Sequence, residues 1–132
     1  MPQTLLKKPL VVLMVVNDAA FFLSHRLAIA QAARDVGYDV HVATPAGPGS
    51  ERIASNGLTF HALPLSRSGT NPLKEIRTIW SLFRLVDCLR PDIVHAITIK
   101  PILYCGWLAH FTSRFALVTA IPGLGYVFSS RG

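Results

Sequence analysis

Acidic residues are scarce in this 132-residue sequence, and their scarcity limits the chemistry that it can perform. Seven Asp and Glu stand against thirteen Lys and Arg, so the chain carries a net charge of +6. Acid/base catalysis by paired carboxylates therefore has few candidates, and we expect Asp18 to be the only acid in a ligand cleft. The excess of positive charge favours anionic partners such as phosphates or acidic lipid head groups.

Cysteine and the common catalytic motifs are also rare or missing. Cys88 and Cys105 lie far apart in apolar segments, so both are predicted to be buried, and they form no metal or redox spacing. The motifs HExxH, GxSxG and GxxxxGK[ST] do not occur in the sequence, so the signatures of zincins, α/β-hydrolases and P-loop proteins are excluded. We expect no metal site. No basic helix or mixed basic and aromatic run indicates a nucleic-acid partner.

No uncharged apolar run reaches the roughly 18 residues that a membrane span needs. The run PLVVLMVV, which starts at Pro9, follows two lysines but lacks the cleavage site of a signal peptide, so it is predicted to be the first strand. Hydrophobic residues nonetheless make up 51% of the chain. Such a composition favours a membrane surface or a partner that covers part of the molecule.

Glycine is missing from the turn where a dinucleotide-binding protein would carry G-x-G-x-x-G. The first predicted strand is followed by NDAAFFLSHR, from Asn17 to Arg26, which argues against a nucleotide-dependent oxidoreductase. A helix start there would present free N–H groups to an anion. Arg26 would add charge-assisted hydrogen bonds to a phosphate, and His25 could donate, accept or act as a base.

A purely structural interpretation of this turn is equally open. Asn17 and Asp18 would then cap the helix, while Phe21 and Phe22 would pack against the sheet. The two interpretations weigh about evenly for Asn17 and His25, whereas packing is favoured for Phe22.

Short β-branched runs alternate with helical periodicity along the whole chain. This order predicts one α/β domain: a Rossmann-like, doubly wound parallel sheet of five strands and about four helices. The strands are expected at residues 10–16, 39–43, 58–63, 92–96 and 116–121. The first helix is expected to bury Leu23, Leu27, Ala30 and Val36 and to stop at Gly37. A second helix is expected at residues 50–55. The third is capped by Asn71, begins at Pro72, is ended by Pro91 and should bury Ile76, Ile79, Phe83 and Val86. The fourth is expected at residues 101–113, with Leu103, Trp107 and Phe111 at spacing four.

Two further strand ends carry candidate ligand groups, because open α/β sheets bind ligands at the carboxyl ends of their strands. Lys100 begins a helix, where it opposes the helix dipole unless an anion lies nearby. His95, inside the fourth strand, is more simply a hydrogen-bonded core residue. Gly123 and Gly125 follow the fifth strand and would let the backbone approach a ligand, although a plain turn explains them equally well.

The stretches FFLSHRLAIAQAARDVGYDVHVATP, RPDIVHAITIKP and AIPGLGYVF resemble, in order and spacing, the N-terminal domain of family 4 glycosyltransferases of the GT-B fold. The resemblance implies an acceptor-binding domain that faces a donor-binding domain across a cleft. It places Asn17, Asp18, His25 and Arg26 on the first cleft loop, Lys100 on the second, and Gly123 and Gly125 on the third. Many members carry a histidine after the fifth strand, but this chain has Ile121-Pro122 there, so no catalytic residue is assigned.

The chain is therefore expected to be a single, partial domain, residues 1–132, cut before it is complete and lacking the donor-binding half. The resemblance implies a retaining transferase without metal or cofactor, which moves a sugar from a nucleotide-diphosphate sugar to a lipid-linked or polysaccharide acceptor. It also implies a cytoplasmic protein in peripheral contact with the inner membrane face. The alternatives are an acceptor-binding subunit of a split enzyme, which an exposed apolar surface at residues 126–128 would support, and a non-catalytic module or remnant that binds sugar or anionic lipid. No glycosyl transfer is expected from the chain alone.

Overall fold

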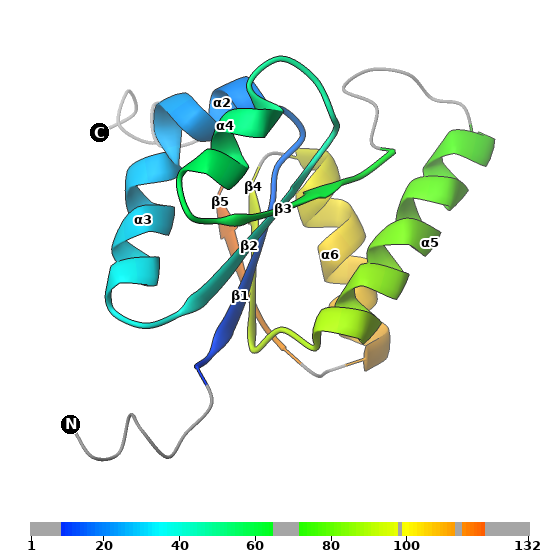
Figure 1. The fold of residues 1–132 in the computed structure, drawn as a ribbon. Helices are drawn as coiled ribbons and strands as arrows, with labels where there is room; N and C mark the ends of the chain where they lie inside the picture. Colours follow the sequence, from blue (N-terminus) through cyan, green and yellow to red (C-terminus); the bar gives the residue numbers. More distant parts are fainter. Residues whose placement is uncertain (1–8, 65–71, 98, 113–114, 121–132) are drawn as a thin grey trace, which may run out of the picture.

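A computed structural model describes residues 9–64, 72–97, 99–112 and 115–120, and it shows one sheet between two layers of helices (Figure 1). The predicted α/β class and the five strands are confirmed, each within about a residue of its expected bounds where both ends are described. The strands are β1 Val11–Val15, β2 Asp39–Thr44, β3 Thr59–Ala62, β4 Ile93–Ile97 and β5 Ala116–Ala120. The helices are α2 Ala19–His25, α3 Leu27–Asp35, α4 Ser50–Ser55, α5 Pro72–Leu89 and α6 Ile99–Thr112.

All strand pairs are parallel, and the strand order is β3-β2-β1-β4-β5. The chain steps outward from β1 to β3, then crosses back over the sheet to pair β4 with the other side of β1. Met14 of β1 lies beside His95 of β4 in this central pair. The winding direction thus reverses between β1 and β4, and such a switch point opens a crevice at the carboxyl ends of both strands.

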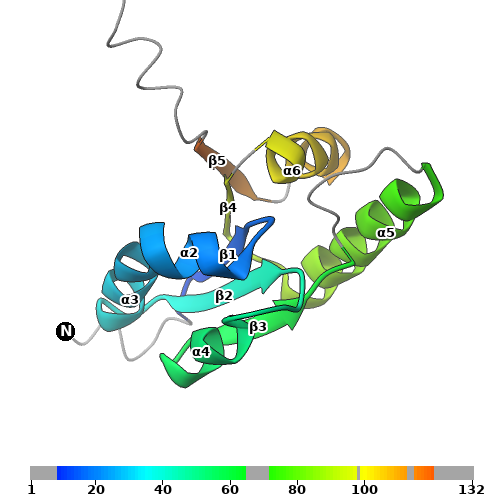
Figure 2. The ribbon, with the colours of Figure 1, turned by 90° about the horizontal axis from the view of Figure 1, so that it is seen from above.

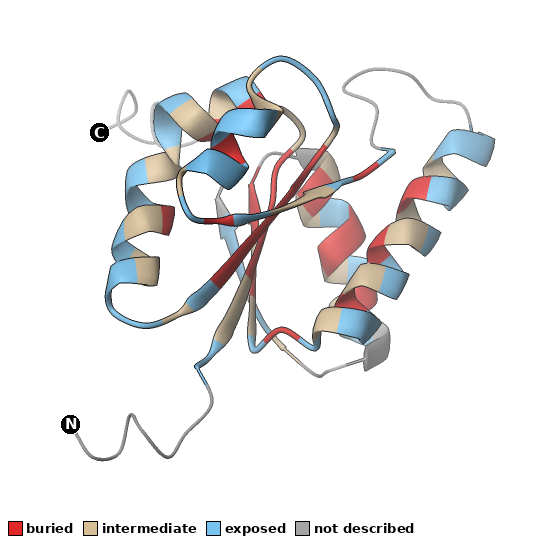
Figure 3. Ribbon diagram, viewed as in Figure 1, coloured by how far each residue is buried: buried red, intermediate tan, exposed pale blue. Residues whose placement is uncertain are grey.

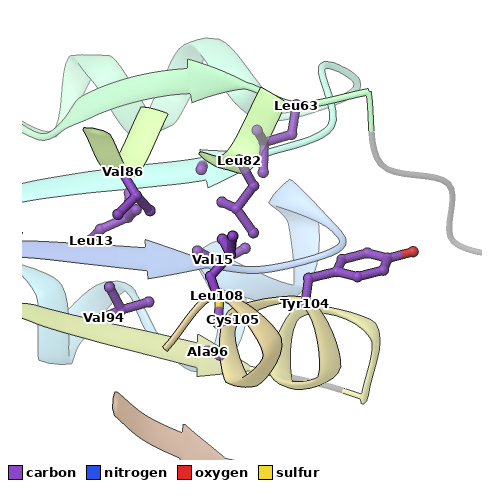
Figure 4. Packing of buried hydrophobic residues seen from close by; sticks show 11 residues of the cluster. Leu13, Val15, Leu63, Leu82, Val86, Val94, Ala96, Tyr104, Cys105 and Leu108 are labelled. Atoms are coloured by element: carbon purple, nitrogen blue, oxygen red, sulfur yellow. The ribbon is translucent and has the colours of Figure 1, made fainter. Parts of the chain in front are cut away.

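The helices divide between the two faces of the sheet, as a doubly wound fold requires. Helices α2, α3 and α4 cover one face, and α5 and α6 cover the other (Figures 1 and 2). The buried parts of the strands lie between these layers (Figure 3). The first core contains the fully buried Phe22 and Ile53. The second core includes Leu13, Leu82 and Leu108. Figure 4 shows Leu13 beside Val86 of α5, and Val15 of β1 near Leu82 of α5 and Leu108 of α6.

The predicted first helix is divided into α2 and α3 at Arg26, so the structure describes five helices rather than about four. The backbone of Arg26 leaves helical geometry, with φ −125° and ψ −7°. Ser24 explains the break, because its Oγ donates back to the carbonyl oxygen of Ala20 at 3.0 Å, a bond that bends helices. The expected stripe also fails at its end, since Val36 is 75% exposed.

Helix α5 buries a different face from the predicted one. Its buried residues are Thr78, Leu82 and Val86. Of the expected stripe, Val86 alone is fully buried, while Ile76 and Phe83 are exposed. The error has a physical cause: α5 is apolar on two faces, and a period of three and four residues fits either of them.

Helix α6 has apolar residues on nearly every side, so spacing alone could not identify its inner face. The expected residues Leu103 and Trp107 are exposed, and the side chain of Phe111 lies outside the described residues. Tyr104, Cys105 and Leu108 are buried instead. Burial raises the pKa of the Cys105 thiol to about 12, in keeping with its predicted role as a small core residue.

Cys88 was expected to be buried as well, and this prediction is wrong, because Cys88 is exposed on α5. It lies on the side of the helix that faces away from the buried residues Leu82 and Val86. The expected N-cap of α5, Asn71, lies outside the described residues.

Candidate functional site

The first loop at the switch point begins with Asn17 and Asp18, directly after β1. Asp18 is the N-cap of α2, and its Oδ1 accepts a hydrogen bond from the backbone N–H of Ala20 at 3.3 Å. Asn17 is half-buried beside it. The capping role is the one that the structural interpretation of this turn predicts. Because a carboxylate already faces the helix start, basic side chains are the better anion-binding groups at this edge.

Arg26 is the most distinctive of the candidate residues. It is half-buried at the junction of α2 and α3, and its Nε atom is buried without a hydrogen-bond partner among the described residues. A buried donor of this kind costs about 1–3 kcal/mol when nothing accepts from it. A phosphate or carboxylate oxygen bound at the junction would satisfy it.

His95 reaches the same region from β4. It is half-buried, and its Nδ1 lies 3.2 Å from the carbonyl oxygen of Val118 on β5. Its pKa lies below the ordinary value of 6.5, mainly because burial disfavours the charged ring and also because the positive charge of Arg26 opposes protonation, although the bond to Val118 acts in the opposite direction. The packing role expected for His95 therefore agrees with its surroundings, and the pKa links it electrostatically to Arg26.

This link can be tested by pH titration. Because the folded pKa is lowered, the unfolded chain takes up a proton first, so the contribution of His95 to stability is lost as the pH falls through 6.5 toward the folded pKa. In Arg26→Ala we expect the pKa of His95 to rise toward 6.5, followed through its ring resonances by NMR. The exposed Arg52 serves as the control, and Arg52→Ala should leave the titration unchanged. An unaltered or lower pKa in Arg26→Ala would contradict the coupling.

Lys100 lies in the first turn of α6. A lysine at a helix start opposes the helix dipole, so we expected an anion near its side chain. Its Nζ lies 3.0 Å from Oε1 of Glu75, in the first turn of α5, and the two side chains are 24% and 27% exposed. Both helices start at the carboxyl edge of the sheet. Glu75 is thus a second acid at this edge, and the expectation that Asp18 would be the only one is wrong.

His25 lies in the last turn of α2 rather than at a helix start. Its ring stacks on Phe21, with ring centroids 4.3 Å apart, and its Nδ1 lies 2.9 Å from Oγ of Ser24. The side chain is exposed. His25 is therefore held against its own helix, one residue from the junction that carries Arg26.

A cleft that the sequence analysis did not identify lies between α2 and the loop that leads from β2 into α4. Its volume is about 450 Å³, and its lining includes Ser24, Gly49 and Arg52. The loop also follows the carboxyl end of a strand, so the cleft lies at the ligand edge of the sheet. The signal available in the sequence was the Gly- and Pro-rich stretch TPAGPGS at residues 44–50.

Gly49 shapes this cleft, and its replacement tests the geometry. Its φ is +91°, and an added Cβ would lie 2.9 Å from Cδ1 of Leu23. We expect Gly49→Ala to lower the free energy of unfolding by about 1–3 kcal/mol in urea denaturation, because alanine disfavours this φ and would displace Leu23. Gly47→Ala in the same loop is the matched control, since a Cβ there meets nothing within 4 Å. Equal losses in both variants would contradict the assignment.

Gly123 and Gly125 lie outside the described residues, so the third loop remains a prediction. Within the described ranges, no group of three His, Cys, Asp or Glu side chains is placed to hold a metal ion. None of the helices described is long and apolar enough to cross a membrane.

Comparisons with known proteins bear on the family and the fold. A family model described as "Glycosyl transferase 4-like" matches residues 11–131. The solved structures similar to the chain include a glycosyltransferase from Rickettsia africae (14% identity, TM-score 0.67, 86% of this chain and 30% of that one). They also include MurG from Acinetobacter baumannii (16% identity, TM-score 0.70, 93% of this chain and 39% of that one). A third is the UDP-GlcNAc 2-epimerase from Neisseria meningitidis (14% identity, TM-score 0.63, 92% of this chain and 35% of that one). No curated protein sequence gives a significant match.

Identities this low show the fold alone, and the fold is shared by a transferase and an epimerase. The chain spans between 30% and 39% of the length of these three structures.

Proposed function

Because the chain belongs to the glycosyl transferase 4-like family, we propose that it is the acceptor-side domain of a glycosyltransferase. The enzyme transfers a sugar from a nucleotide-diphosphate sugar to a lipid-linked or polysaccharide acceptor, in the cytoplasm and at the inner membrane face. The observation that carries this proposal is the Nε of Arg26 at the junction of α2 and α3, which is buried and has no hydrogen-bond partner in the part of the chain that the structure describes. A phosphate of the lipid-linked acceptor would accept the hydrogen bond that this Nε–H group can donate.

The proposed chemistry needs electrostatic stabilisation more than covalent help. An acceptor hydroxyl oxygen forms a bond to the anomeric carbon of the donor sugar, while the bond from that carbon to the diphosphate oxygen breaks and the hydroxyl proton passes to the leaving diphosphate. The negative charge that develops on the leaving diphosphate is stabilised by preorganised positive groups. In this proposal the donor-binding unit supplies such groups for the leaving diphosphate. Arg26 binds the diphosphate of the acceptor, and Lys100, whose charge is shared with Glu75, lies at the same side of the cleft.

The remaining residues of the site have positioning roles in this proposal. Asn17 and Asp18 fix the start of α2, and His25 borders the junction at Arg26. Gly123 and Gly125, which lie outside the described residues, would contribute the third loop of the cleft in this proposal. The reaction uses no metal or cofactor.

A donor-binding unit completes the active site, either as further polypeptide or as a separate subunit. A single wall of the cleft would leave the reacting carbon open to water. We therefore expect the 132-residue chain alone to bind acceptor without transferring sugar. A non-catalytic module that binds sugar or anionic lipid is the competing function, and it requires no such partner.

The test is a comparison of ligands by NMR, with the full chain and two probes. Farnesyl diphosphate represents a lipid-linked acceptor, and UDP-N-acetylglucosamine represents the donor. We expect farnesyl diphosphate to shift the amides around Arg26 and Lys100, and the nucleotide sugar to bind at least about tenfold more weakly. Farnesol, which lacks the diphosphate, is the control for apolar binding.

Tighter binding of the nucleotide sugar at the same amides would contradict an acceptor-side role. If farnesyl diphosphate binds as expected, addition of a donor-binding domain should produce sugar transfer in the presence of both substrates. Acceptor binding that never leads to transfer with any donor-binding partner would favour the non-catalytic module.

A further inference from the structure

The second apolar side of α5 faces outward and forms a groove with α6. The groove has a volume of about 380 Å³, and it is lined by Ile76, Ile79, Trp80, Phe83, Trp107 and Leu108. Three of these side chains are strongly exposed: Ile76 is 62% exposed, Trp80 61% and Trp107 52%. Trp80 and Phe83 stack on each other with ring centroids 5.9 Å apart. We call this surface the α5–α6 face.

The groove lies apart from the cleft beside α2. Helices α5 and α6 cover the opposite side of the sheet from α2, α3 and α4 (Figures 1 and 2). In Figure 3 the outer side of α5 is mainly exposed, whereas its inner side contacts the core. Exposed apolar residues that gather in one groove mark an interaction surface, whereas scattered ones need no explanation.

Basic residues flank the apolar stripe of α5. Lys74, Arg77, Arg84 and Asp87 are the exposed charged residues of this helix, so three of the four are basic. Asp87 is seven residues after Trp80 and lies on the line of that tryptophan, while Arg77 and Arg84, also seven residues apart, lie on a second line along the helix. That line runs beside Trp80 and Phe83. A helix with tryptophan and aliphatic residues on one side and Arg and Lys next to them is suited to the interface of an anionic bilayer.

We propose that the α5–α6 face binds the surface of a membrane that contains anionic phospholipids. The inference rests on the proposed acceptor role and deepens it by naming the surface that brings the domain to a lipid-linked substrate. Trp80, Phe83 and Trp107 enter the head-group region, while Arg77 and Arg84 contact lipid phosphates. A protein partner or a second copy of the chain would use the apolar stripe, but neither requires the flanking positive charge.

The face carries its own reporter. Trp80 and Trp107 are the chain's two tryptophans, and both line the groove. Their fluorescence emission therefore reports on this surface alone. When the full chain is mixed with vesicles of phosphatidylcholine and phosphatidylglycerol, we expect a shift of the emission to shorter wavelength and flotation of the protein with the vesicles. Vesicles of phosphatidylcholine alone should give at least about tenfold weaker binding, and added salt should reduce the difference.

Two pairs of variants separate the apolar and the charged contributions. Ile76→Glu with Phe83→Glu keeps both tryptophans and should abolish the shift. Its matched control is Ile29→Glu with Val36→Glu, which replaces exposed apolar residues of α3 on the other side of the sheet and should leave the shift intact. Arg77→Ala with Arg84→Ala should weaken anionic vesicle binding about 25-fold, or about fivefold for each residue. Arg52→Ala with Arg90→Ala removes the same number of exposed positive charges outside α5, and this control should change anionic vesicle binding much less.

The outcomes distinguish the possible occupants of the groove. Equal binding to neutral and anionic vesicles, or no binding to either, would overturn the proposal. A fluorescence shift that follows protein concentration without vesicles would assign the face to a second copy. Vesicle binding without any shift at the amides around Arg26 on addition of farnesyl diphosphate would support the membrane face and overturn the acceptor role. The reverse result would overturn the membrane face and leave the acceptor role in place.

Discussion

Phe22→Ala is expected to lower the free energy of unfolding by about 3–5 kcal/mol, which is a large part of the stability of a small domain. Phe22 is fully buried in the core between the sheet and α2, and among the described residues it is the largest fully buried side chain. Its removal would leave a cavity beneath the helix that carries Asp18 and the Arg26 junction. Urea denaturation followed by circular dichroism measures the loss.

The adjacent Phe21 provides the matched control, because it is chemically identical but only half-buried and stacks on His25. Phe21→Ala should cost less than half as much. If the two variants lost the same stability, Phe22 would not be the residue that anchors α2. A Phe22→Leu variant should retain most of the stability, since it fills much of the same volume.

Arg26→Ala is expected to weaken the binding of farnesyl diphosphate by roughly 10- to 100-fold. A charge-assisted hydrogen bond contributes about 1.5–3 kcal/mol, and each 1.4 kcal/mol is about tenfold in affinity. The loss should be electrostatic, so Arg26→Lys should recover part of the affinity by restoring the charge without the planar fork. Isothermal titration calorimetry of the folded variants gives the affinities.

Arg90→Ala is the control for net charge, because Arg90 is exposed between α5 and β4, at the opposite edge of the sheet. It should change the affinity less than about twofold. Lys100→Ala is expected to have a smaller effect than Arg26→Ala, since Glu75 already neutralises much of the charge of Lys100. If Arg26→Ala bound as tightly as the unmodified chain, the anion site would have to be sought elsewhere on the carboxyl edge.

The strands could be predicted from sequence because a strand that is buried on both faces appears as a continuous run of apolar residues. Runs such as Val11–Val15 are apolar throughout, and short turns separate them from the helices. Helix faces were harder to predict. Helix α5 carries two apolar sides, and the choice between them depends on which residues meet the sheet, which local periodicity does not contain. The break at Arg26 depends on one side-chain hydrogen bond from Ser24.

The candidate site was predictable to the same limited degree. Its expected location follows from the order of the strands, and Asp18 and Lys100 lie at the carboxyl edge of the sheet, where the sequence predicts them. Glu75 was missed because it lies on a different helix from Lys100, its ion-pair partner, and 25 positions before it in the sequence. The electrostatic link between Arg26 and His95 likewise joins a helix junction to a distant strand, and no local pattern predicts it.

The position of β1 in the centre of the sheet has a consequence for the time course of folding. Val12 pairs with Val40 on one side and with Ile93 on the other, so this apolar strand gains its second neighbour only when distant segments meet. Parallel pairings between such remote segments slow the search for the native state relative to helical bundles. During synthesis, β1 must wait for the ribosome to deliver β4, and until then its free edge is open to aggregation or to a chaperone.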